Sequence, residues 1–126
     1  MPAADGPQPL VLLVDDSEDN REVYAQYLAF SGFRVEIAVD GVEAVEKAAS
    51  LHPDVIVMDL SLPRLDGWEA TRQIKSAPAT SDIPVIALTG HAVSESKRRA
   101  LDVGCSGYLT KPCLPDILVS EIRRLV

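Results

Sequence analysis

The chain has 126 residues and a net charge of −7, with 47 % hydrophobic and 25 % charged residues. These values are typical of one folded domain and exclude collagen-like, mucin-like and wholly disordered chains. The longest apolar run, Leu10–Val14, has five residues, which is too short to span a membrane. For that reason we do not expect a membrane as a partner. Binding to nucleic acid requires a positive surface, so the net negative charge leads us to expect no nucleic acid as a partner either.

The first nine residues contain three prolines, and no Lys or Arg precedes Arg21. They therefore lack the charged start and apolar middle of a signal peptide. We expect a disordered leader over residues 1–9, one domain over residues 10–126 and a cytoplasmic location. In that compartment Cys105 and Cys113 are expected to be reduced.

Short apolar runs rich in β-branched residues predict buried strands over residues 10–14, 55–58 and 85–88. Weaker strands are predicted over residues 34–38 and 107–109. Between the strands, apolar residues recur at helical spacing and predict amphipathic helices. The first series is Val23 and Tyr27 with Tyr24 and Leu28, the second is Ala44, Val45 and Ala48, and the last is Leu114, Leu118, Ile122 and Leu125.

Helix ends are indicated by four residues of the right type. Gly32 and Gly104 are expected to end two helices, Asp40 to cap another at its start, and Pro115 to stand in a first helical turn. Strand and helix therefore alternate five times along the chain. This order predicts an α/β fold, a five-stranded parallel sheet with helices on both faces.

Polar residues follow the predicted strands where ligands bind in such sheets, at the carboxyl ends. They are Asp15, Asp16, Asp59, Thr89 and Lys111. Three carboxylates brought together repel one another, so a divalent cation with oxygen ligands, Mg2+ in the simplest case, is the natural counter-charge. Lys111 and Thr89 could meet the oxygens of a phosphoryl group, and an aspartate there can be the nucleophile that forms an aspartyl phosphate.

Each of these residue types can also have a purely structural role or be exposed to solvent. A pair of aspartates can begin a polar loop, a threonine can bond to backbone at a strand end, and a lysine can be solvated. Trp68 is expected to pack in the core and not to stack on a ligand. The basic residues of the second half are expected to be solvated helix faces, with partner docking as the alternative: Lys97, Arg98, Arg99, Arg123 and Arg124.

Five segments resemble the receiver domain of bacterial two-component response regulators, in its order and spacing: VLLVDDSEDN, AVDGVEAV, DVIVMDLSLPRLDGWEATRQIK, IPVIALTGHA and GYLTKP. The resemblance covers residues 10–126. It implies a flavodoxin-like (βα)5 fold with strand order 2-1-3-4-5. It also implies a phosphorylation-activated switch, without turnover of a separate substrate, that signals by protein contact, either alone or as the receiver of a hybrid kinase.

The same resemblance implies the role of each site residue. Asp59 would accept phosphoryl from a phosphohistidine of a histidine kinase or histidine phosphotransfer protein. Asp16, Asp59 and the backbone carbonyl of Ser61 would be direct Mg2+ ligands, and Asp15 would act through water.

Lys111 and Thr89 would each contact a phosphoryl oxygen, and Tyr108 would change its side-chain orientation when the domain is phosphorylated. The bond between Lys111 and Pro112 is expected to be cis. Pro63 and Gly67 match the turn after the acceptor strand.

Some positions depart from the family pattern. Leu114 stands where the last helix usually gains a polar cap. Ser61 and His91, two residues after Asp59 and Thr89, stand at positions that, by the resemblance, modulate loss of the phosphoryl group in the family. Neither would hold a hydrolytic water firmly, so we expect a phosphoryl group that lasts minutes or more, an order of magnitude that follows from the need for a positioned water.

Two other classes share part of the pattern. Phosphohydrolases of the haloacid-dehalogenase kind also use a strand-end aspartate, but they place a second aspartate two residues later, where this chain has Ser61. A flavin or dinucleotide module would need a Gly-rich loop after the first strand, where this chain has Asp15, Asp16 and Ser17. Both alternatives therefore fit the residues less well.

Overall fold

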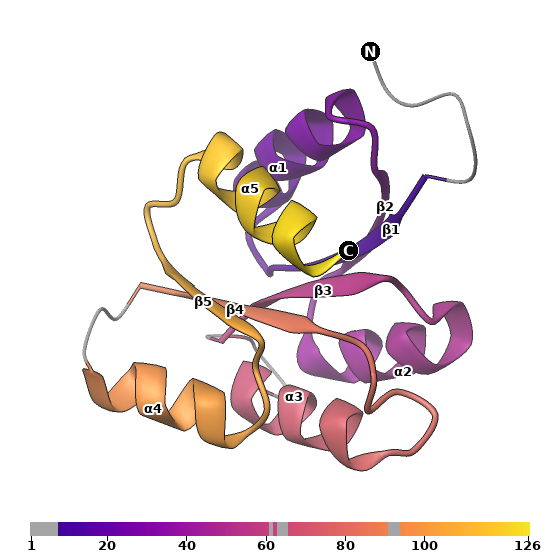
Figure 1. Cartoon of the computed structure of the whole chain (residues 1–126). Helices are drawn as coiled ribbons and strands as arrows, with labels where there is room; N and C mark the ends of the chain where they lie inside the picture. The colour runs from indigo at the N-terminus through magenta and orange to yellow at the C-terminus, as the bar shows by residue number, and fades with distance from the viewer. Residues whose placement is uncertain (1–7, 61, 63–65, 91–93) are drawn as a thin grey trace.

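The computed structural model describes residues 8–60, 62, 66–90 and 94–126. Strands and helices alternate along this part of the chain (Figure 1). The strands are β1 (Leu10–Val14), β2 (Arg34–Ala38), β3 (Val55–Asp59), β4 (Val85–Thr89) and β5 (Gly107–Thr110). The helices are α1 (Glu18–Phe30), α2 (Gly41–Leu51), α3 (Gly67–Ser76), α4 (Ser94–Asp102) and α5 (Pro115–Leu125). None of these helices has the length and apolar character needed to cross a membrane.

The strands form one parallel sheet in the order β2-β1-β3-β4-β5, which confirms the predicted fold class and strand order. Helices α1 and α5 cover one face, and α2, α3 and α4 cover the other (Figure 1). The chain runs outward from β1 to β2, then returns to the other side of β1 and continues through β3. The strand order therefore reverses beside β1 and β3, and the carboxyl ends of these two strands are where such sheets bind ligands.

The core lies in two layers, one on each face of the sheet. Alternate residues of β1 point to opposite layers: Val11 and Leu13 pack with α1 and α5, and Leu12 and Val14 pack with the other helices. Burying a side chain of this size contributes about 1.5–3 kcal/mol. All five residues of β1 are buried, as a strand covered on both faces requires.

The predicted helix ends are confirmed. Gly32 and Gly104 have φ values of 100° and 103°, so each supplies the left-handed residue that follows a helix. The Asp40 carboxylate accepts a hydrogen bond from the backbone of α2. Pro115 begins α5, and Leu114 before it makes no side-chain capping bond, as expected for an apolar residue.

Three strands are one residue longer than predicted, because β3, β4 and β5 include Asp59, Thr89 and Thr110. The apolar pattern stops before these residues, but the backbone pairing continues. Asp59 is in register with Leu88, and Thr89 with Thr110. A ladder of backbone hydrogen bonds does not depend on side-chain polarity, so the strands extend into the polar site.

Both cysteines are free thiols, as predicted. Cys105 is buried, and burial raises the pKa of its thiol to about 11. Cys113 is partly exposed, and burial together with the charge of Asp116 also raises the pKa of its thiol. Because the thiolate is the reactive form, both should react slowly at neutral pH, and Cys105 more slowly.

We therefore expect iodoacetamide at pH 8 to alkylate Cys113 first, and Cys105 only after unfolding in denaturant. Peptide mapping by mass spectrometry at successive times measures the two rates. Equal rates in the folded protein would contradict the burial of Cys105.

Candidate functional site

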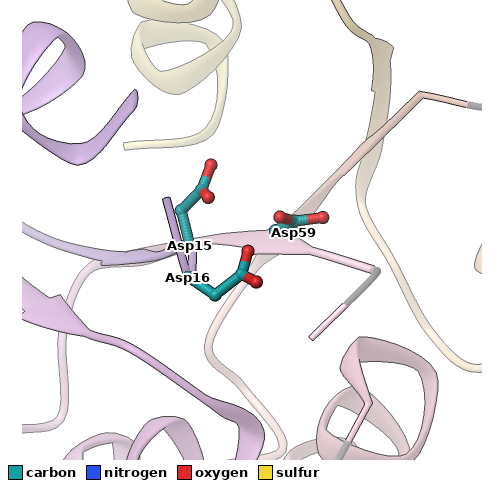
Figure 2. A group of neighbouring side chains, drawn as sticks. All are labelled: Asp15, Asp16 and Asp59. Carbon is teal, nitrogen blue, oxygen red and sulfur yellow. The ribbon is translucent and has the colours of Figure 1, made fainter. Parts of the chain in front are cut away.

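Three carboxylates meet at the carboxyl ends of β1 and β3 (Figure 2). Carboxylate oxygens of Asp15, Asp16 and Asp59 all lie within 4.8 Å of one another. Asp15 is fully buried and Asp59 is 4 % exposed, whereas Asp16 is exposed. The structure therefore brings together the three aspartates that the sequence predicts, with one side of the cluster open to solvent.

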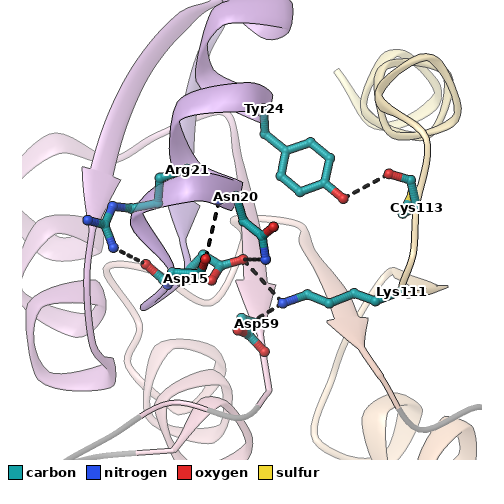
Figure 3. A network of polar contacts seen from close by, with 8 residues as sticks. Asp15, Asn20, Arg21, Tyr24, Asp59, Lys111 and Cys113 are labelled. Carbon is teal, nitrogen blue, oxygen red and sulfur yellow. Dashed lines mark hydrogen bonds and ion pairs between the residues drawn. The ribbon is translucent and has the colours of Figure 1, made fainter.

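The start of α1 fixes the position of Asp15 (Figure 3). One carboxylate oxygen of Asp15 accepts from the backbone N–H of Ser17 at 2.9 Å, and the other lies 3.5 Å from the amide nitrogen of Asn20. The Arg21 guanidinium donates to the backbone carbonyl of Asp15 at 2.9 Å. These contacts orient the carboxylate before any ligand binds.

Lys111 lies in the loop after β5 and reaches back to the acidic cluster (Figure 3). Its Nζ is 3.3 Å from Oδ2 of Asp15 and 3.2 Å from Oδ2 of Asp59. The Lys111 backbone N–H donates to the carbonyl of Thr89 at 2.6 Å. The peptide bond between Lys111 and Pro112 is cis, as the resemblance implied.

The charge of Lys111 is secure at neutral pH. Burial acts to lower the pKa of the ammonium, but the carboxylates of Asp59 and Asp15 together outweigh burial and raise that pKa above its usual value. Because the folded pKa is raised, the stabilisation that Lys111 contributes while the two carboxylates are ionised is lost on the alkaline side only as the pH rises from about 10 through the higher folded pKa.

The four charged groups do not balance. Asp15, Asp16 and Asp59 bring three negative charges, and Lys111 neutralises one of them. Hard oxygen ligands on one open-sided cluster are the donor set that Mg2+ takes in proteins, with water completing its coordination. The residues present therefore fit this cation.

Gly67 allows the start of α3 to lie against the end of β3. A Cβ atom at this position would stand 2.3 Å from the backbone oxygen of Asp59, so any other residue would displace that backbone. The Gly67 N–H donates to the carbonyl of Leu60 at 3.2 Å. The glycine that the resemblance placed in the turn after Asp59 is thus required by close packing.

Thr89 and Tyr108 occupy the neighbouring strands. Thr89 ends β4 and is 1 % exposed, one residue beyond the partner of Asp59 in the ladder. Tyr108 lies within β5 opposite Ala87 and packs, half-buried, on the core layer of α2, α3 and α4. Their roles toward a phosphoryl group stay predictions. Ser61, Pro63 and His91, and the side chain of Lys97, lie outside the described residues.

Three of the basic residues, Arg99, Arg123 and Arg124, make separate contacts in the described part of the chain. Arg99 of α4 lies over the Trp68 ring, 4.5 Å from its centroid, and this stacking joins α4 to α3. Arg123 lies 5.8 Å from the centroid of Phe33, beside the end of α1. Arg124 pairs with a glutamate of its own helix. Trp68 also packs on the core, which confirms its predicted packing role.

Sequence reasoning missed three residues around the site: Asn20, Arg21 and Tyr24. Of the four apolar residues that the spacing indicated in α1, Tyr24 and Leu28 are buried, whereas Val23 and Tyr27 are exposed. A buried tyrosine hydroxyl requires a hydrogen-bond partner. Its partner is the carbonyl of Cys113, 89 residues later, at 2.8 Å. The need for a partner was readable from the sequence, but the identity of the partner depends on the fold.

Comparison with known proteins decides the family. Residues 11–123 match the family model of the response regulator receiver domain. The chain belongs to the response regulator receiver family. Over 116 residues the receiver domain is 40 % identical to response regulator MprA of Mycobacterium ulcerans and, equally, to that of Mycobacterium leprae. The matched region is 92 % of this chain, and about half, 49 % and 50 %, of those two relatives.

Solved receiver domains have the same architecture. The chemotaxis protein CheY4 of Vibrio cholerae matches with a TM-score of 0.90 and 32 % identity, over 95 % of this chain and 100 % of that one. The receiver domain of the sensor histidine kinase PA1611 of Pseudomonas aeruginosa matches with a TM-score of 0.87 and 35 % identity, over 94 % and 98 %. In the PA1611 structure a magnesium ion is coordinated in the active-site cleft. Membership of this family implies phosphorylation-dependent signalling.

Proposed function

We propose that Asp59 accepts a phosphoryl group from a phosphohistidine of a histidine kinase or histidine phosphotransfer protein, with Mg2+ bound beside it. The observation that carries this proposal is the position of Lys111, whose ammonium bridges Asp15 and Asp59 at the strand ends. A nucleophilic carboxylate next to a fixed cation can attack phosphorus while the cation stabilises the charge on the phosphoryl oxygens.

In this transfer, an Asp59 carboxylate oxygen forms the bond to phosphorus as the bond from phosphorus to the donor imidazole nitrogen breaks. The imidazole leaves with the electron pair and takes up a proton. Mg2+, when bound, would neutralise part of the negative charge on the phosphoryl oxygens. Lys111 would move from its carboxylate partners to one such oxygen, and Thr89 would donate to another.

The aspartates would divide the work of holding the metal. Asp16, Asp59 and the backbone carbonyl of Ser61 are the proposed direct ligands. The carboxylate of Asp15 already accepts from Ser17 and contacts Lys111, which favours contact with the metal through water. Asp16 is exposed and therefore accessible to an ion from solvent.

The proposed output is a protein contact. Phosphorylation would draw Thr89 inward, change the orientation of Tyr108 and shift an existing equilibrium at the face formed by α4, β5 and α5. Large apolar side chains are exposed on α4 and at the start of α5: Leu101, Leu114 and Ile117. Exposed apolar groups on these helices support a protein as the downstream target.

Incubation with acetyl phosphate and Mg2+, followed by intact-mass measurement, tests the function. We expect one phosphoryl group per chain, located on Asp59 by peptide mapping, and none when EDTA replaces Mg2+. Continued release of phosphate from simple phosphoesters, with no adduct on the chain, would instead favour the phosphohydrolase alternative.

A further inference from the structure

A buried tyrosine joins α1 to the loop that carries Lys111. Tyr24 is 7 % exposed and packs in the core layer between α1 and α5. Its hydroxyl donates to the carbonyl of Cys113 at 2.8 Å (Figure 3). This contact connects the helix that orients Asp15, a member of the acidic cluster, with the segment that carries Lys111, whose ammonium contacts that cluster.

The loop of residues 111–114 is held on both sides of Lys111. On the strand side, the Lys111 N–H donates to the carbonyl of Thr89 at 2.6 Å. On the helix side, the carbonyl of Cys113 accepts from Tyr24. Pro112 has no N–H to donate, and Leu114 gives α5 no side-chain cap. The bond from Tyr24 therefore supplies a restraint that neither of these two residues provides.

From this arrangement we infer that Tyr24 is a positioning residue for phosphoryl transfer, acting through Lys111. Its hydroxyl fixes the carbonyl two residues beyond Lys111, and so holds Nζ where it meets both Asp15 and Asp59. The inference rests on the proposed function of Asp59. Transfer is sensitive to such placement because a fixed cation lowers the barrier only when it stands where charge develops.

The hydroxyl is suited to this role at every physiological pH. Burial is the main cause that raises the pKa of Tyr24 above its usual value. The group thus remains a protonated donor. Phenylalanine has the same ring and would fill the same space in the core. The substitution Tyr24→Phe therefore removes the positioning hydroxyl and keeps the packing.

The test compares Tyr24→Phe with Tyr27→Phe, which removes the hydroxyl of a more exposed tyrosine one turn later on the same helix, 39 % exposed. Initial rates of Asp59 phosphorylation by acetyl phosphate are measured at saturating Mg2+. Both substitutions are also made in a Lys111→Ala background, and Mg2+ affinity is read from the thermal midpoint. All variants are first checked for folding by circular dichroism.

We expect Tyr24→Phe to slow phosphorylation about three- to tenfold, the range that one lost hydrogen bond of typical net strength produces. Mg2+ affinity should change little, Tyr27→Phe should match wild type, and the Tyr24→Phe effect should disappear when Lys111 is absent. An unchanged rate, or an equal slowing with and without Lys111, would overturn the inference. A wild-type chain that gains no phosphoryl group would refute the proposed function instead.

Discussion

Asp59→Asn is expected to abolish phosphorylation completely and to raise the thermal midpoint of the metal-free protein. An amide offers no anionic oxygen to attack phosphorus, so no slower route through the same atom remains. The substitution also removes two close carboxylate repulsions at the cost of one contact with Lys111, which keeps its contact with Asp15.

Since two repulsions are lost for one attraction, we expect stabilisation of about 1 kcal/mol, or roughly 3–6 °C for a domain of this size. Differential scanning calorimetry in EDTA measures the shift, and radiolabelled acetyl phosphate measures the acceptor activity.

Asp102→Asn, at the far end of α4, makes the same aspartate-to-asparagine change at an exposed position outside the cluster and is the control for loss of one negative charge. It should leave both phosphorylation and the midpoint near wild type. Label accepted by Asp59→Asn at the wild-type rate would show that another residue is the acceptor. A lower midpoint in EDTA would show that the pair with Lys111 outweighs carboxylate repulsion.

The positions of Asp15, Asp59 and Lys111 could be predicted because parallel strands carry the residues that follow them to the same edge of the sheet. Buried apolar runs fix which segments are strands, and alternation with helices fixes their direction. The convergence of these side chains then follows without any knowledge of distances. The order of the strands in the sheet, by contrast, was predicted from the family resemblance and not from the pattern of apolar runs.

The contacts of Tyr24, Arg99 and Arg123 could not be predicted in this way. Each joins elements that are distant in sequence, and each depends on how two helices pack or how a loop returns. Helical spacing indicates which side of a helix is buried, but not which residue of another element meets it. For the same reason Arg99 and Arg123, which were grouped together in the sequence, contact different elements in the fold.

Mg2+ is expected to raise the thermal midpoint of the unphosphorylated protein, because the folded chain assembles a ligand set that the unfolded chain lacks. At ten times its Kd a bound ion adds about 1.4 kcal/mol of stability, which corresponds to roughly 4–8 °C here. Asp16→Ala should remove most of this gain and slow phosphorylation strongly. The exposed carboxylate is the one that an arriving ion meets first.

Asp19→Ala is the matched control, since Asp19 is an exposed acid in the first turn of α1 and lies outside the cluster. It should retain the Mg2+ response, because a nearby negative charge that is not a ligand contributes only a screened attraction. Midpoints are compared at fixed ionic strength, with NaCl replacing MgCl2, so that screening is the same in every sample. If wild type and Asp16→Ala respond equally, Asp16 is not a ligand. If neither responds to millimolar Mg2+, the acidic cluster is not a metal site.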